Sequence, residues 1–150
     1  TACTNLAYAY ENGTGVPKDA RKASALYKRA CDGGNMLGCN NLGVNYQNGT
    51  GVPKDPRKAN ALYKRACDGG DMKGCLNLGV HYEKGIGVPK DAGKTNALYK
   101  KACDGGYMGG CGYLGYNYAN GIGVSQDRSE GRRLLQRACD GGSKWACGQL

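Results

Sequence analysis

The sequence predicts an all-α protein, a solenoid of helix-turn-helix repeats. Cysteine recurs along the whole chain with alternating gaps of 28 and 8 residues, which gives a strict period of 36 residues. Apolar residues recur within each period at spacings of three and four, which is typical of one face of a helix. Glycine also recurs at fixed places between these segments, as expected for turns. A period of this length is typical of repeat arrays in which each unit packs mainly on its neighbours.

The first helix of each repeat is represented by residues 36–48. Its apolar or small residues share one helical face and are Cys39, Leu42, Gly43 and Tyr46. The glycine of this face recurs in later repeats as Gly79 and Gly115. Because glycine lowers helix propensity, we expect it to be needed for close contact with another helix.

The second helix of each repeat is represented by residues 56–67, after a turn at 49–54. Asp55 is a suitable N-cap, because its carboxylate can accept backbone N–H bonds, and Pro56 suits the first helical position. The residues of its apolar face are Ala59, Leu62, Tyr63 and Ala66. Asp19, Asp91 and Asp127 recur at the N-cap position, and a Gly-Gly pair ends the helix.

The chain is expected to form a single repeat domain over residues 1–150. It contains four helix pairs, at about 1–36, 37–72, 73–108 and 109–142, and a partial first helix at 143–150. The fourth repeat departs from the others, with Ser125 in the turn and Gly131, Arg133 and Leu135 in the second helix. Such divergence is typical of a capping repeat. The near-identity of the other repeats leaves open an idealised or designed repeat protein without a ligand.

The nine cysteines predict disulfides in an oxidising compartment. The chain has one histidine and no Cys-x-x-Cys pair, so we expect neither a metal site nor another cofactor. Two pairings fit the spacing. Cysteines 8 residues apart would join successive repeats, and cysteines 28 apart would close each helix pair. The chain-entropy model favours the longer loop by only about 1 kcal/mol, so the spacing alone leaves both pairings open.

The net charge of +9 comes mainly from lysine and arginine on the second helices. We interpret these residues as a solvated face, with cations suited to helix C-termini, and expect no specific nucleic-acid partner. No apolar run approaches the length of a membrane span, so no membrane span is expected.

Three motifs carry a resemblance to a known family. Leu-Gly-x-x-Tyr in the first helix, Gly-x-Gly-Val-x-x-Asp in the turn and Ala-x-x-Leu-Tyr-x-x-Ala-Cys in the second helix resemble the Sel-one-like repeat, a relative of the tetratricopeptide repeat. Cysteines spaced Cys-x7-Cys across each Asp-Gly-Gly turn resemble the Helicobacter cysteine-rich protein family. The resemblance covers the whole chain.

The resemblance implies a right-handed α/α superhelix and an exported, secreted or periplasmic protein. It implies the short disulfide pairing, with Cys3 unpaired; the pairs would be Cys31–Cys39, Cys67–Cys75, Cys103–Cys111 and Cys139–Cys147. The family is also described as binding penicillin-type compounds, as putative weak β-lactamases and as meeting host cells.

Related repeats bind ligands in a concave groove lined by the first helices. The residues predicted to line it form four rows, one residue from each repeat. The first row is Asn5, Asn41, Asn77 and Tyr113, and the second is Tyr8, Val44, Val80 and Tyr116. The third includes Asn48 and Lys84, and the fourth includes Asn45, His81 and Asn117. Asparagine both donates and accepts hydrogen bonds, so such rows suit an extended peptide backbone. The alternative is that these asparagines are merely exposed and that the valines pack on neighbouring helices.

Catalysis is not expected. No serine is followed by lysine at the third position, as a serine β-lactamase requires. His81, the only histidine, is expected to be an exposed residue of a first helix, with ligand contact as the alternative. The leading hypothesis is a secreted or periplasmic scaffold that binds a protein, peptide or peptidoglycan-like ligand, including a host protein. A slow β-lactam-binding hydrolase is the alternative. The protein is expected to be a monomer, unless Cys3 forms a disulfide dimer.

Overall fold

The computed structural model describes residues 1–150 and consists of nine α-helices. They are α1 (Ala2–Asn12), α2 (Ala20–Asp32), α3 (Met36–Asn48), α4 (Pro56–Asp68), α5 (Met72–Lys84), α6 (Ala92–Asp104), α7 (Met108–Asn120), α8 (Arg128–Asp140) and α9 (Lys144–Gly148). The odd-numbered helices are the first helices of the repeats, and the even-numbered helices are the second. The predicted all-helical repeat fold is therefore confirmed, and α3 has its predicted bounds.

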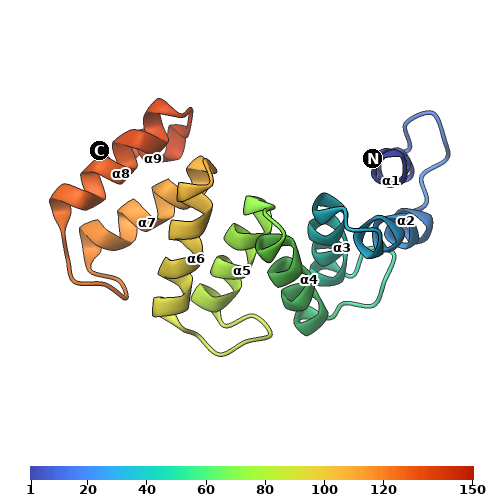
Figure 1. The fold of residues 1–150 in the computed structure, drawn as a ribbon, viewed down its shortest axis with the longest axis horizontal. Helices are drawn as coiled ribbons and strands as arrows, with labels where there is room; N and C mark the ends of the chain where they lie inside the picture. Colours follow the sequence, from blue (N-terminus) through green and yellow to red (C-terminus); the bar gives the residue numbers. More distant parts are fainter. The chain divides into compact units, whose positions relative to one another are not determined.

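The helices form two compact units, an N-terminal unit of residues 1–74 and a C-terminal unit of residues 75–150. In the N-terminal unit, α1 packs on α2, α2 on α3 and α3 on α4 (Figure 1). In the C-terminal unit, α6 packs on α7, α7 on α8 and α8 on α9. Contacts between successive helices are what a repeat array requires, because each helix pair buries its apolar face against the next.

The second helices begin at aspartate caps, as predicted. The side chain of Asp19 accepts a hydrogen bond from the backbone N–H of Lys22, and Asp91 and Asp127 do the same for Lys94 and Glu130. Asp55 accepts from two backbone N–H groups, and Pro56 is the first residue of α4. These caps satisfy N–H groups that have no partner within the helix, so each turn ends at a defined residue.

The second helix of each of the first three repeats carries a buried tyrosine. Tyr27, Tyr63 and Tyr99 are fully buried. Their hydroxyls donate hydrogen bonds to the side chains 16 residues earlier, at distances of 2.8 Å to Glu11, 2.6 Å to Gln47 and 3.2 Å to Glu83. Burial, and for Tyr27 and Tyr99 the adjacent glutamate, raises the pKa of these phenols above its usual value. These bonds tie the second helix to the first within each repeat.

The recurring glycine of the first helix packs against this tyrosine. A Cβ on Gly43 would lie 2.7 Å from Cε1 of Tyr63, and one on Gly79 would lie 2.8 Å from Cε1 of Tyr99. Both distances are too short for a real side chain, so the predicted close helix contact is confirmed.

The fourth repeat achieves the close contact differently. Leu135 stands in place of the tyrosine, and Gly131 replaces the alanine found earlier in the second helix. A Cβ on Gly115 would lie 2.8 Å from the carbonyl oxygen of Gly131, and one on Gly131 would lie 2.6 Å from the backbone nitrogen of Ala119. The two glycines therefore let the backbones of α7 and α8 approach directly.

Disulfides join the second helix of one repeat to the first helix of the next. The structure contains Cys31–Cys39, Cys103–Cys111 and Cys139–Cys147, each with a sequence separation of 8. Cys67 and Cys75 are also disulfide-bonded, whereas Cys3 has a free thiol. The structure therefore has the short pairing that the family resemblance implies. Disulfides of this kind are typical of proteins outside the cytoplasm.

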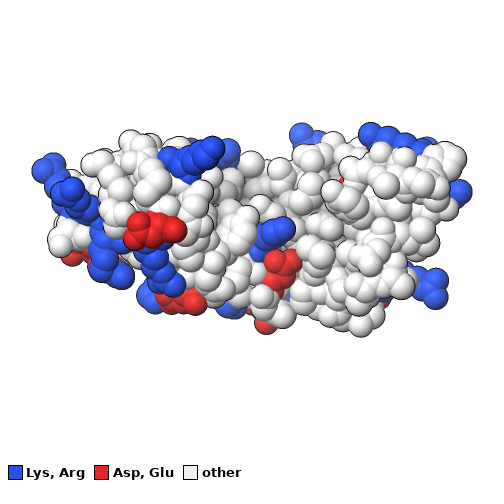
Figure 2. Space-filling view, turned by 90° about the horizontal axis from the view of Figure 1, so that it is seen from above, with Lys and Arg blue, Asp and Glu red and all other residues white.

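Basic residues lie at the surface of both units. On the face shown in Figure 2, lysine and arginine side chains form separate groups, and acidic side chains adjoin some of them. None of the helices is long and apolar enough to cross a bilayer.

Candidate functional site

Two of the four predicted rows lie at the surface of the first helices. In the first row, Asn5 is exposed, Asn41 and Asn77 are half-buried, and Tyr113 is 39% exposed. In the second row, Tyr8 is 60% and Tyr116 39% exposed, whereas Val44 and Val80 are half-buried. Parts of both rows are therefore accessible to a ligand. The largest exposed side chains within these two rows are tyrosines.

The fourth row is almost fully buried and does not form an exposed row of the groove, although Asn117 reaches the lining of a hollow described below. Asn45, His81 and Asn117 are only 2%, 2% and 3% exposed. The expectation that His81 is an exposed residue is therefore wrong. Burial and the nearby Lys84 ammonium lower the pKa of His81 below its usual value, so the imidazole is held neutral.

The buried asparagines link successive repeats instead. Asn45 donates from Nδ2 to Oγ of Ser24, at 3.0 Å, and that hydroxyl donates to the carbonyl oxygen of Thr50, also at 3.0 Å. In the C-terminal unit, Asn117 donates to Oδ1 of Asn96, at 2.7 Å. The sequence does contain a signal for this burial, because the polar residues at 24 and 96 interrupt the apolar face of the second helix.

The third row marks the ends of the first helices. Asn48 and Lys84 are both exposed. At the equivalent positions, Asn12 and Asn120 donate to the carbonyl oxygens of Tyr8 and Tyr116, one turn earlier in the same helix. These asparagines therefore finish a helix, whereas Lys84 places an ammonium group at the corresponding end of α5.

A hollow in the C-terminal unit brings several predicted residues together. It has a volume of about 230 Å³. Its lining comprises Val80, Glu83, Lys84, Tyr113, Tyr116, Asn117 and Trp145, from α5, α7 and α9. Two members of this lining, Glu83 and Trp145, were not among the predicted groove residues. We refer to it as the aromatic hollow.

Three aromatic rings cluster at the aromatic hollow. The ring centroid of Trp145 lies 5.3 Å from that of Tyr113, in an edge-to-face arrangement with an interplanar angle of 67°, and 5.9 Å from that of Tyr116. Tyr113 also lies 5.4 Å from the buried Tyr99 ring, which fixes it against the core. These separations fall in the range of favourable edge-to-face and tilted aromatic pairs. The Trp145 side chain nevertheless remains 44% exposed.

The sequence of α7 makes room for Trp145. A Cβ on Gly112 would lie 3.3 Å from Cζ3 of the indole, so a larger residue would press on the ring. The equivalent positions in the second and third repeats carry Asn40 and Leu76. Glycine at position 112 therefore accompanies Trp145, because it leaves room for the indole ring.

The 36-residue period could have identified both missed residues. Trp145 occupies the repeat position of Leu37, which is itself 43% exposed, and Glu83 occupies that of Gln47. What the sequence did not show is that the shortened ninth helix carries the indole across to α7.

The chemistry of the aromatic hollow suits contact with a protein or peptide. Flat aromatic faces provide apolar area at low cost in side-chain entropy, and the phenol hydroxyls, Lys84 and Glu83 provide polar groups at the rim. No group of three or more histidine, cysteine, aspartate or glutamate side chains in residues 1–150 could hold a metal ion.

Comparison with known proteins identifies the repeat. The Sel1 repeat matches residues 1–35, 37–71, 73–107 and 110–143. No curated protein sequence matches the chain.

Solved structures share the fold. A protective antigen of uropathogenic Escherichia coli, c5321, is 34% identical with a TM-score of 0.95 over 99% of this chain and 32% of its own. A Sel1 repeat protein from Oxalobacter formigenes is 29% identical with a TM-score of 0.94, over 99% of this chain and 60% of its own. This chain thus spans about a third and three fifths of these two relatives.

A third solved structure is that of the Helicobacter pylori cysteine rich protein B. It is 35% identical with a TM-score of 0.71, over 89% of this chain and 96% of its own. Sel1 repeats are in general protein-interaction repeats. Four matched repeats, the all-helical fold and these neighbours together show that the chain belongs to the Sel1 repeat family.

Proposed function

We propose that this protein is an exported scaffold that binds a peptide segment of another protein in the aromatic hollow. One observation carries the proposal: Tyr113, Tyr116 and Trp145 cluster around a hollow of about 230 Å³ and remain 39%, 39% and 44% exposed. Exposed aromatic clusters are unusual on a solvated surface and are typical of interaction sites. Tyrosine and tryptophan are also the residues that most often dominate binding energy.

The rim of the aromatic hollow provides the polar groups that a peptide needs. Lys84 offers an ammonium and Glu83 a carboxylate, and the two tyrosines offer phenol hydroxyls. Because Tyr113 packs on the buried Tyr99, the site is largely formed before a ligand arrives. Preformed sites lose less entropy on binding, so a short segment can be held.

Export is supported by the disulfides. Cysteine pairs such as Cys31–Cys39 and Cys103–Cys111 staple successive repeats, and such cross-links persist in oxidising compartments. The similarity to the Helicobacter pylori cysteine rich protein B points the same way. The partner is therefore sought among proteins of the cell surface, the periplasm or a host.

The test begins with a peptide selected by phage display against the oxidised protein. Trp145 is the only tryptophan in the chain, so its fluorescence reports directly on the aromatic hollow. We expect the peptide to change this fluorescence, and Tyr116→Ala to weaken binding by about thirtyfold, as for an interface hot spot.

Tyr8→Ala is the matched control, because Tyr8 occupies the same repeat position in α1 and is 60% exposed. It should leave the affinity unchanged. Equal losses in the two variants, or binding without a change in Trp145 fluorescence, would refute the assignment of the site.

A further inference from the structure

A second hollow lies in the N-terminal unit. It has a volume of about 230 Å³ and lies at α2, α3 and α4. Its apolar lining comprises Leu42, Tyr46, Ala61 and Leu62. Its charged lining comprises Lys28 and Lys58, from two helices, and the carboxylate of Asp32. We refer to it as the basic hollow.

Cations outnumber anions around the basic hollow. Lys28 pairs with Asp32 at 2.7 Å, and Arg65 approaches the same carboxylate at 3.7 Å. Lys58 lies above the ring of Tyr46, 5.4 Å from its centroid, and is 3.9 Å from Asp55. The hollow itself is thus lined by two lysines and one carboxylate, with Arg65 and Asp55 beside it. The Lys58 pair is long, and exposed pairs of this kind contribute little, so its ammonium can turn to a new anion at small cost.

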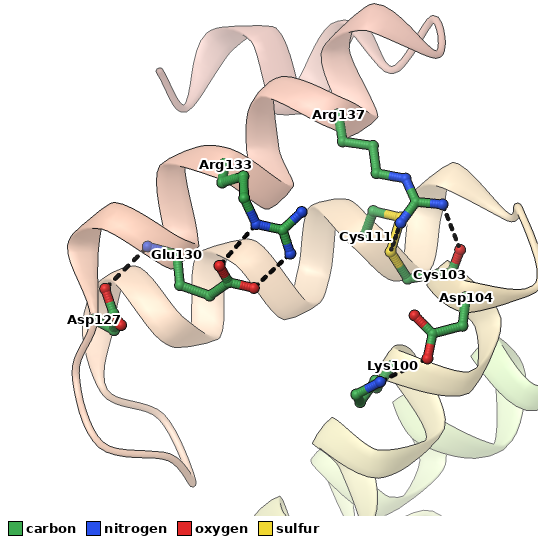
Figure 3. A network of polar contacts seen from close by, with 8 residues as sticks. All are labelled: Lys100, Cys103, Asp104, Cys111, Asp127, Glu130, Arg133 and Arg137. Carbon is green, nitrogen blue, oxygen red and sulfur yellow. Dashed lines mark hydrogen bonds and ion pairs between the residues drawn. A yellow bond between two sulfur atoms is a disulfide. The ribbon is translucent and has the colours of Figure 1, made fainter.

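The equivalent positions of the fourth repeat carry different residues. Seventy-two residues later in the sequence, Glu130 occupies the position of Lys58 and Arg133 that of Ala61. Arg133 donates to both carboxylate oxygens of Glu130, at 2.8 and 2.6 Å (Figure 3). The chain therefore carries its own charge pair at this position in the fourth repeat, whereas in the second repeat a small Ala61 leaves the hollow open.

We infer that the basic hollow is a second docking site, which takes an acidic peptide segment of a partner protein. One aliphatic side chain of the segment lies on Leu42, Ala61 and Leu62. Glutamates or aspartates flanking that side chain pair with Lys58 and Lys28. The net charge of +9 attracts such segments and raises the rate of encounter.

The experiment measures fluorescence anisotropy of a labelled peptide with one leucine flanked on both sides by glutamates. Two matched peptides replace the leucine by glycine or the glutamates by glutamine. Because each loses one of the two interactions, both should bind the wild-type protein at least about tenfold more weakly.

Ala61→Arg distinguishes two modes of binding: insertion of the peptide's aliphatic side chain into the hollow, and simple charge attraction. It adds positive charge, which alone would strengthen binding of an acidic peptide, but it fills the hollow as Arg133 does in the fourth repeat. We expect it to weaken binding by about tenfold, and Lys58→Glu to weaken it through charge reversal. Ala61→Ser keeps the hollow open and should bind as the wild type does.

Gly148→Arg is the charge control, because a Cβ at that position would meet no atom within 4 Å. Circular dichroism and thermal melts establish that each variant is folded. Tighter binding by Ala61→Arg, or weaker binding by Gly148→Arg to the same extent, would overturn the proposal. So would no binding, or backbone amide shifts in NMR spectra that fall on the aromatic hollow and spare Leu42, Ala61 and Leu62.

Discussion

The N-terminal and C-terminal units follow one 36-residue plan, yet their surfaces differ. On the first helices, the second repeat presents Asn41 and Val44, where the fourth presents Tyr113 and Tyr116. On the second helices, it is the second repeat that has a hollow, beside Ala61. The fourth repeat carries an arginine–glutamate pair at the equivalent position.

This difference shows where a repeat protein can change. The positions that hold repeats together keep their chemistry: the aspartate caps, the disulfides and the buried polar link recur in both units. The exposed positions vary because no neighbouring repeat depends on them. Binding surfaces can therefore differ along the chain while the fold is retained.

The largest effect is expected where the fourth repeat packs backbone on backbone. Gly115→Ala places a Cβ 2.8 Å from the carbonyl oxygen of Gly131, which cannot move without shifting a helix, and should lower the free energy of unfolding by about 3 kcal/mol. Gly43→Ala faces the Tyr63 ring, and alanine also raises helix propensity, so we expect a loss of about 1 kcal/mol. Urea unfolding measures both. A greater loss for Gly43→Ala would contradict the distinction between the two packings.

The disulfides should be equivalent in the two units. Replacing Cys31 and Cys39 together by alanine, or Cys103 and Cys111 together, opens a loop of the same length, so each should cost about 2.5 kcal/mol by the chain-entropy model. Thermal and urea unfolding of the oxidised proteins provide the comparison. Clearly unequal losses would show that the two repeat junctions are not equivalent.

The polar links should differ modestly. Asn117→Ala removes the donor to Oδ1 of Asn96, a buried amide oxygen, and should cost about 2 kcal/mol. Asn45→Ala should cost about 1 kcal/mol, because the Ser24 hydroxyl keeps its own bond to the carbonyl oxygen of Thr50. Equal losses in urea unfolding would sink this ranking.

The smallest effect is a pH dependence from His81. Burial and the nearby Lys84 ammonium lower its pKa in the folded protein, so below the ordinary value of about 6.5 the unfolded chain binds more protons than the folded one. Stability should therefore fall as the pH decreases below about 6.5. His81→Asn, which installs the residue found at positions 45 and 117, should remove this contribution. A wild-type and variant difference that stays constant from pH 7 to pH 5 would contradict it.

The periodicity of the sequence predicted most of the fold. The cysteine period, the aspartate caps and the recurring glycine represented by Gly43 each meet a structural requirement within one repeat. The same residue therefore recurs in other repeats. The candidate site was predicted only in part. Tyr113 and Tyr116 lie at the surface as expected, whereas His81 is buried, because polar residues can also serve as links between helices.

Other features depend on contacts between chain segments and could not be predicted. Trp145 joins Tyr113 only because Gly112 leaves space on α7. The basic hollow depends on Ala61, whose small size is unremarkable in the sequence but leaves space beside two lysines. Such features arise from the juxtaposition of helices and not from a pattern along one of them.

In the function proposed above, the tyrosines of the fourth repeat turn a surface common to the repeats into a binding site. The double variant Tyr113→Asn/Tyr116→Val restores the residues of the second repeat, so its affinity for the selected peptide tests this role directly. We predict a folded protein that binds the peptide at least about a hundredfold more weakly, because two hot-spot side chains are lost. Unchanged affinity in a folded variant would contradict the claim.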